Sequence, residues 1–167
     1  MLIAIDVEDT ASPPPLSVVV ACFDRLRRSL PGHPILLYTG AWWWQPRGWN
    51  GASITPHLWL SRYVSGSGYA GSLYGSVPAS WWSPGFGDWP RATMLQYSSK
   101  GTAAGISGNI DVNVFEGTSA QLAALAGVSS TLTLQPPKER ARLANQNRDD
   151  IMQQAQLAIQ EENAKTN

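Results

Sequence analysis

The feature that most limits the possible folds of this chain is an alternating stretch at its front, Ile-Ala-Ile-Asp-Val-Glu-Asp at residues 3–9. Successive side chains of a strand point to opposite faces of a sheet. One face of this stretch is β-branched, with Ile3, Ile5 and Val7, while the other carries Asp6 and Glu8. The pattern is typical of a strand in an α/β barrel, where helices cover the apolar side and the strand ends carry the chemistry.

Asp6 and Glu8 form a candidate catalytic pair. At roughly 3.3 Å of rise per residue, their Cα atoms stand about 6.6 Å apart, and both side chains point to the same face. Two carboxylates at this spacing repel each other, so we expect one of them to keep its proton near neutral pH and to serve as an acid. The alternative is a strand that ends in an ordinary acidic turn.

The composition excludes several classes of function. The 167 residues carry no net charge, so we expect no capture of nucleic acid or of an anionic membrane. The sequence holds no apolar run of the about 18 residues that a membrane span needs, and its front lacks the pattern of a signal peptide. The one cysteine, Cys22, lies on an apolar helical pattern, which predicts a buried and inert thiol.

Tryptophan is concentrated in the middle of the chain. All eight Trp residues lie between Trp42 and Trp89, in a stretch that is rich in Gly and poor in acids. Because Trp is rarely buried completely, this composition favours an exposed aromatic surface that stacks on flat apolar faces such as those of sugar rings. The alternative is that several of these rings anchor long loops to the body of the domain.

The remaining periodicity predicts alternating helices and strands. Apolar residues at helical spacing predict a helix over residues 16–30, which Pro31 ends. Short connections between strand, helix and strand predict right-handed βαβ units and a parallel sheet. The further strands are expected at 34–39, 58–64, 92–98 and 109–115, with long loops at 40–57 and 65–91 and a capped short helix at 120–126.

The last of these strands repeats the opening pattern. Ile110, Val112 and Val114 share its outer face, while Asp111 and Asn113 share the inner face with Phe115. After this part the composition changes to a polar sequence without aromatic residues. We therefore expect a catalytic-type α/β domain over 1–127, a linker over 128–137, and a polar helical or disordered tail over 138–167.

The order of these motifs resembles glycoside hydrolase family 25, the lysozymes that cut the muramic-acid linkage of peptidoglycan. The resemblance covers residues 2–127 and is carried by Asp6-Val7-Glu8, residues 34–39, 58–63, 95–99 and 105–115 in succession. It implies a partial TIM-like (β/α) barrel of about five mostly parallel strands, which correspond to the fourth to eighth strands of the family's barrel. The family's first three strands have no counterpart in this chain.

The resemblance also implies roles for individual residues. Glu8 matches the general acid, Asp6 the neighbour that tunes it, and Asp111 the acid that completes the carboxylate cluster; the family retains the anomeric configuration. The residues that match the sugar-binding cleft are Tyr38, Trp59, Tyr63 and Gln96. Leu95 stands where the family usually has Trp, so we expect one cleft wall to differ, with Trp81, Trp82 or Trp89 compensating.

The resemblance implies no cofactor. A divalent cation held by Asp6, Glu8 and Asp111 is an alternative, although no metal-ligating His lies near them in the sequence. The expected partner is peptidoglycan, with a role resembling a phage endolysin that reaches the cell wall from the host cytoplasm, or a secreted enzyme. Because five strands do not close a normal barrel, the chain is expected to be a fragment, one half of a split enzyme completed by a second polypeptide, or a non-catalytic glycan-binding remnant.

Overall fold

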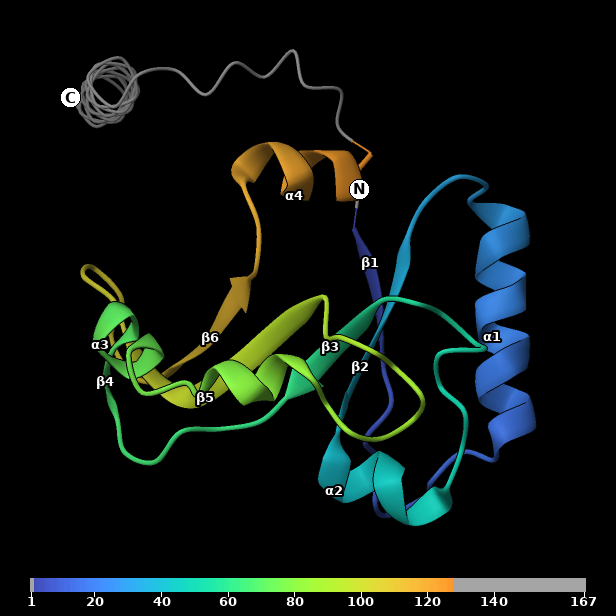
Figure 1. The fold of residues 1–167 in the computed structure, drawn as a ribbon, viewed down its shortest axis with the longest axis horizontal. Coiled ribbons are helices and arrows are strands. Elements are labelled where there is room, and N and C mark those ends of the chain that lie inside the picture. Colours follow the sequence, from blue (N-terminus) through green and yellow to red (C-terminus); the bar gives the residue numbers. More distant parts are fainter. Residues whose placement is uncertain (1, 128–167) are drawn as a thin grey trace, which may run out of the picture. The chain divides into compact units, whose positions relative to one another are not determined.

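The computed structural model of the protein describes residues 2–127 and holds a six-stranded sheet (Figure 1). The strands are β1 (Ile3–Asp6), β2 (Ile35–Gly40), β3 (Leu58–Ser61), β4 (Gly68–Tyr69), β5 (Met94–Thr102) and β6 (Ile110–Phe115). The helices are α1 (Leu16–Ser29), α2 (Ala41–Trp44), α3 (Ala70–Tyr74) and α4 (Ser119–Leu125), with 3₁₀ turns η1 (Gln45–Arg47) and η2 (Ala79–Trp82). The strand order is β1-β2-β3-β5-β4, and β6 also pairs with β5.

Neighbouring strands of the main sheet run parallel, as the sequence predicts. Asp6 of β1 lies opposite Tyr38 of β2, and Tyr38 lies opposite Trp59 of β3. Ser61 of β3 lies opposite Gln96 of β5. This register brings the carboxyl ends of β1, β2, β3 and β5 to one edge of a curled half-barrel.

The last strand is the exception in this mostly parallel sheet, because β6 pairs antiparallel with β5. Only residues 103–109 connect the two strands. A parallel pair needs a crossover of about a dozen residues or more, so this short connection permits only an antiparallel return. The reversal places the start of β6, with Asp111, beside the carboxyl end of β5.

Helix α1 covers the outer side of β1 and β2 (Figure 1). It begins after Pro15, and its buried stripe consists of Val19 and Phe23, one helical turn apart. The stripe is narrow, so Cys22 lies beside it and is exposed. The predicted burial of Cys22 is therefore wrong.

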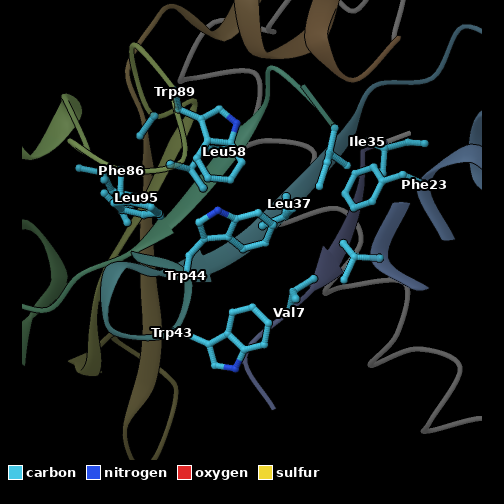
Figure 2. Packing of buried hydrophobic residues seen from close by; sticks show 14 of the residues in the cluster. Val7, Phe23, Ile35, Leu37, Trp43, Trp44, Leu58, Phe86, Trp89 and Leu95 are labelled. Atoms are coloured by element: carbon cyan, nitrogen blue, oxygen red, sulfur yellow. The ribbon is translucent and has the colours of Figure 1, made fainter. Parts of the chain in front are cut away.

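The core contains much of the tryptophan. Trp43, Trp44, Trp82 and Trp89 are each at most 4% exposed. Figure 2 shows Trp44 in the middle of the cluster, between Trp43 on one side and Trp89 on the other. The predicted exposed stacking surface is wrong for these four residues, and the alternative, in which rings anchor the loops, holds for them.

Three of these indoles are buried at little cost because their single polar atoms find backbone acceptors. Trp43 Nε1 donates to the Asp9 carbonyl at 2.9 Å, and Trp44 Nε1 donates to the Trp49 carbonyl at the same distance. Trp89 Nε1 donates to the Thr55 carbonyl at 2.7 Å. One acceptor lies in the connection after β1 and the other two lie in the connection before β3, so the rings hold these two connections in place.

Glycines make room for one of these rings. A Cβ atom on Gly51 or on Gly87 would collide with the Trp89 indole, and Gly87 also has a positive φ of 64°. The same two glycines are joined by a hydrogen bond from Gly51 N to Gly87 O of 2.8 Å. Trp89 therefore lies in a slot that binds the loop before β3 to the loop before β5.

Two predicted loops contain regular structure. The segment 40–57 holds α2 and η1, and the segment 65–91 holds β4, α3 and η2. Strand β5 extends to Thr102, beyond the predicted end at residue 98. Helix α4 confirms the predicted short helix, with Thr118 and Gln121 forming a reciprocal capping box. Within 2–127, none of the helices has the length and apolarity to cross a membrane. The predicted linker at 128–137 and tail at 138–167 lie outside the described residues.

Candidate active site

A cleft of about 340 Å³ opens at the carboxyl ends of the parallel strands. It contains all of the residues that the sequence singled out as catalytic or substrate-binding. Its lining consists of Ala4, Asp6, Glu8, Tyr38, Trp59, Tyr63, Gln96, Asp111 and Asn113. Sequence reasoning did not name Asn113 as a site residue, although the alternation of the last strand places it on the same face as Asp111.

The β1 strand directs Asp6 and Glu8 into the cleft by simple alternation. Between them, Val7 is 3% exposed and packs into the core on the other side of the sheet. The end of the strand is held by two hydrogen bonds to β2: Val7 N donates to Tyr38 O at 3.0 Å, and Thr39 Oγ1 donates to Val7 O at 2.8 Å. The two carboxylates are therefore attached to paired backbone rather than to a free loop.

The electrostatics of the cleft favour a protonated Glu8. Burial raises the pKa of the Glu8 carboxyl, and the negative charges of Asp6 and Asp111 raise it further. Burial also raises the pKa of Asp6. In the described part of the chain, no Lys or Arg forms an ion pair with any of these three acids. A carboxyl in such surroundings holds its proton to a higher pH and is suited to general acid work.

Gln96 connects two tyrosines at the cleft wall. Its side chain is 5% exposed, and its Oε1 accepts a hydrogen bond from the Tyr63 hydroxyl at 2.9 Å and another from the Tyr38 hydroxyl. The two hydroxyl oxygens lie 3.5 Å apart. Burial raises the pKa of Tyr38, so its hydroxyl remains a neutral donor. The result is a fixed set of hydroxyl groups beside the carboxylates.

Trp59 supplies an aromatic wall on the same side. Its Nε1 donates to Asn113 Oδ1 at 3.0 Å, and its ring meets the Tyr38 ring edge-to-face with centroids 5.5 Å apart. The indole is only half-buried, so part of its apolar surface faces the cleft. A fixed indole next to hydroxyl and amide groups matches the mixed apolar and polar surface of a sugar ring.

The predicted change in the cleft wall at Leu95 is wrong. Leu95 is completely buried in the hydrophobic core, on the opposite face of β5 from Gln96. Trp82 and Trp89 are also core residues, and Trp81 does not line the cleft, so none of the three replaces a missing wall. The departure from the family pattern at this position therefore alters core packing.

The described residues do not form a metal centre. Within 2–127, no group of three or more His, Cys, Asp or Glu side chains is arranged to hold a metal ion. His33 and His57 lie outside the cleft lining, and burial lowers the pKa of His57. This finding gives no support to the alternative of a cation between the three acids.

The protein belongs to the class of α/β half-barrels with a cleft at the carboxyl ends of the parallel strands. Glycoside hydrolases built on α/β barrels have carboxylates at the same place. A search against family models finds no match. The chain is 34% identical to Lysozyme M1 of Streptomyces globisporus over 94 residues, which is 55% of this chain and 27% of that protein.

The fold is also similar to the crystal structure of a bacterial lysozyme from Streptomyces coelicolor. The TM-score is 0.52 at 24% sequence identity, and the match covers 74% of this chain and 54% of that chain. The protein is thus homologous, over part of its length, to bacterial lysozymes of the Streptomyces type, in agreement with the resemblance to glycoside hydrolase family 25. It spans about a quarter of the curated relative and about half of the solved one.

Proposed function

We propose that residues 2–127 are the catalytic part of a peptidoglycan-hydrolysing lysozyme. The reaction is hydrolysis of the β-1,4 bond between N-acetylmuramic acid and N-acetylglucosamine in the bacterial cell wall. The observation that carries the proposal is the cleft in which Glu8, with a raised pKa, lies with Asp6 and Asp111 and without a cationic partner. The phage endolysin role remains a prediction from the sequence.

In this proposal Glu8 is the general acid. It gives its proton to the glycosidic oxygen as the bond between that oxygen and the anomeric carbon breaks. Positive charge develops at the anomeric carbon, and the carboxylates of Asp6 and Asp111 stabilise it. The resemblance to the family implies retention, for which the acetamido group of the substrate itself is a candidate nucleophile. Water then completes hydrolysis and returns a proton to Glu8.

The four remaining predicted site residues bind the glycan. Trp59 offers its half-buried ring to the apolar face of a sugar, and the hydroxyl groups of Tyr38 and Tyr63 face the sugar's polar groups. Gln96 acts through the two tyrosines, because its Oε1 accepts from both hydroxyl groups. Sugar binding by these residues would hold the scissile bond beside the carboxylates, where Glu8 transfers its proton.

We further propose that full activity needs strands beyond those described. Among residues 2–127, β1 pairs with β2 on one side and has no strand on the other. An open strand edge presents unpaired backbone donors and acceptors that another strand satisfies. The additional strands would come from the same polypeptide or, as the sequence also suggests, from a second polypeptide.

The test is release of reducing ends from purified bacterial cell walls, by the chain alone and with the missing strands supplied. We expect Glu8→Gln to lower the rate by at least about a hundredfold, because the proton donor is lost. Glu116→Gln is the matched control, since Glu116 pairs with Arg91 and does not line the cleft. Absence of hydrolysis by the completed wild-type protein would refute the enzymatic proposal.

A second candidate is a glycan-binding protein without hydrolytic activity, which the open edge of β1 favours. In that case, the chain would bind insoluble peptidoglycan in a pull-down, and Glu8→Gln would bind as well as the wild type. Hydrolysis by the wild-type protein would rule this candidate out.

A further inference from the structure

A second pocket adjoins the catalytic cleft and differs from it in charge. It has a volume of about 450 Å³ and shares Tyr63 with the cleft. Its other lining residues are Ala41, Trp42, Gln45, Ser61, Arg62 and Pro84. No acidic residue lines this pocket, whereas three acids line the cleft, so a ligand that spans both meets opposite electrostatic environments.

Arg62 is the single charged residue of the second pocket. Its guanidinium carbon lies 4.7 Å from the centroid of the Trp81 ring. Its backbone N–H donates to Gln96 O at 3.0 Å, which fixes the start of the side chain. In the described part of the chain, Arg62 forms no ion pair with a carboxylate. A guanidinium that stacks on a ring keeps its in-plane N–H groups free for a bidentate carboxylate.

Trp42 provides the apolar side of the pocket. Its side chain is 56% exposed, in contrast to the buried neighbours Trp43 and Trp44. Its indole packs directly against Gly40, since a Cβ atom there would collide with the ring. An exposed ring in the same pocket as a guanidinium without a carboxylate partner suits a ligand that is apolar in one part and anionic in another.

We propose that this second pocket binds the carboxylate-bearing peptide attached to muramic acid in peptidoglycan. Arg62 pairs with a free carboxylate of that peptide, and Trp42 packs on its aliphatic portion. The inference rests on the proposed function for its substrate class, because the pocket lies next to the cleft where the glycan would be cut. Peptide binding in this pocket makes the protein selective for glycan that carries peptide over glycan without peptide.

The test compares two ligands that differ in one charge. N-acetylmuramyl-L-alanyl-D-isoglutamine and its terminal amide are titrated against the full chain by NMR or calorimetry. We expect the wild type to bind the acid about tenfold more tightly than the amide, the size of one charge-assisted contact. Arg62→Gln should bind both forms equally, and Arg62→Lys should keep part of the preference.

Two further variants test whether the preference for the acid comes from the contact between Arg62 and the ligand carboxylate. Arg91→Gln is the matched control, because Arg91 also lies over an indole, that of Trp82, but outside the pocket. It should keep the preference for the acid. Trp42→Ala should lower the affinity for both ligands by the same factor and leave the preference for the acid unchanged. Far-UV circular dichroism of each variant checks that it is folded.

The proposal is overturned if the wild type binds acid and amide equally, or if Arg62→Gln retains the preference. These outcomes are independent of catalysis, because binding is measured without turnover. Failure to release reducing ends together with an intact acid preference would refute the proposed hydrolysis alone. Hydrolysis together with a lost preference would refute the peptide pocket alone.

Discussion

The indole N–H of Trp59 donates to Oδ1 of Asn113 at 3.0 Å, which joins β3 to β6 across the intervening β5. Together with the edge-to-face contact to Tyr38, this bond holds a half-buried ring at the cleft. A ring that is already oriented loses less conformational entropy when a sugar binds. Asn113 is therefore a positioning residue that acts through Trp59.

We predict that Asn113→Ala weakens glycan binding roughly two- to tenfold, the equivalent of one lost hydrogen bond. Titration of a soluble peptidoglycan fragment, followed by indole fluorescence, measures the effect. Asn109→Ala is the control, since Asn109 is exposed just before β6. Equal affinities of the two variants would contradict the positioning role of Asn113.

The pH profile depends on the charge of Asp111. Since this charge raises the pKa of Glu8, Asp111→Asn lowers that pKa. A general acid works only while protonated, so the alkaline limb of the activity profile moves to lower pH. Asp88→Asn is the control, because Asp88 lies away from the cleft and Asn tolerates its positive φ of 59°. An unchanged alkaline limb in Asp111→Asn would exclude electrostatic coupling to Glu8.

The same carboxyls affect stability with a defined sign. The pKa values of Asp6 and Glu8 are raised in the folded protein. At a pH between the unfolded-state pKa of such a carboxyl and its higher folded-state pKa, the folded state therefore binds more protons than the unfolded state. Stability therefore falls as pH rises through this window. We expect Glu8→Gln to be more stable than the wild type at pH 7, by at most about 1 kcal/mol because the site is partly solvated.

Urea unfolding at pH 7 and below pH 4 checks this prediction. The advantage of Glu8→Gln should disappear at the lower pH, where Glu8 is protonated in both states. Glu116→Gln should show no such gain, since its carboxylate is paired with Arg91 in the native state. An advantage that is the same at both pH values would show that the effect is not electrostatic.

The glycine slot around Trp89 predicts a packing defect. Gly51→Ala places a Cβ atom into the buried indole, which should cost about 1–3 kcal/mol. Gly75→Ala is the control, because Gly75 has a helical φ of −57° and its nearest contact would be an ordinary 3.4 Å. The measurement is urea unfolding, and equal stabilities would refute the slot.

The buried position of Leu95 predicts that the Trp usual in the family at this place would not fit in this protein. Because Leu95 is fully buried in the core, Leu95→Trp should overpack the core and destabilise the fold by about 1–3 kcal/mol or more. It should not improve glycan binding. Leu95→Met, which nearly conserves volume, should cost less than about 1.5 kcal/mol. Tighter glycan binding by Leu95→Trp would show that the residue reaches the cleft after all.

Local periodicity was enough to predict which residues lie on the cleft side of each strand. Alternation alone placed Asp6 and Glu8 opposite Val7, and Asp111 and Asn113 opposite Val112, because the side-chain period of a strand does not depend on the rest of the fold. Helical spacing predicted α1, and local signals predicted the short capped helix that corresponds to α4, since both patterns arise within one or two turns of chain. The roles of the site residues remain predictions.

Tertiary structure alone decided which rings are buried and which side chains face the second pocket. Trp44 and Trp42 are two residues apart, yet one is fully buried and the other is 56% exposed, because burial depends on what distant loops bring to each ring. The same holds for Cys22 at the edge of a narrow helical stripe and for Arg62 on the Trp81 ring. Periodicity sets the direction of a side chain, whereas its neighbours come from contacts between segments far apart in the chain.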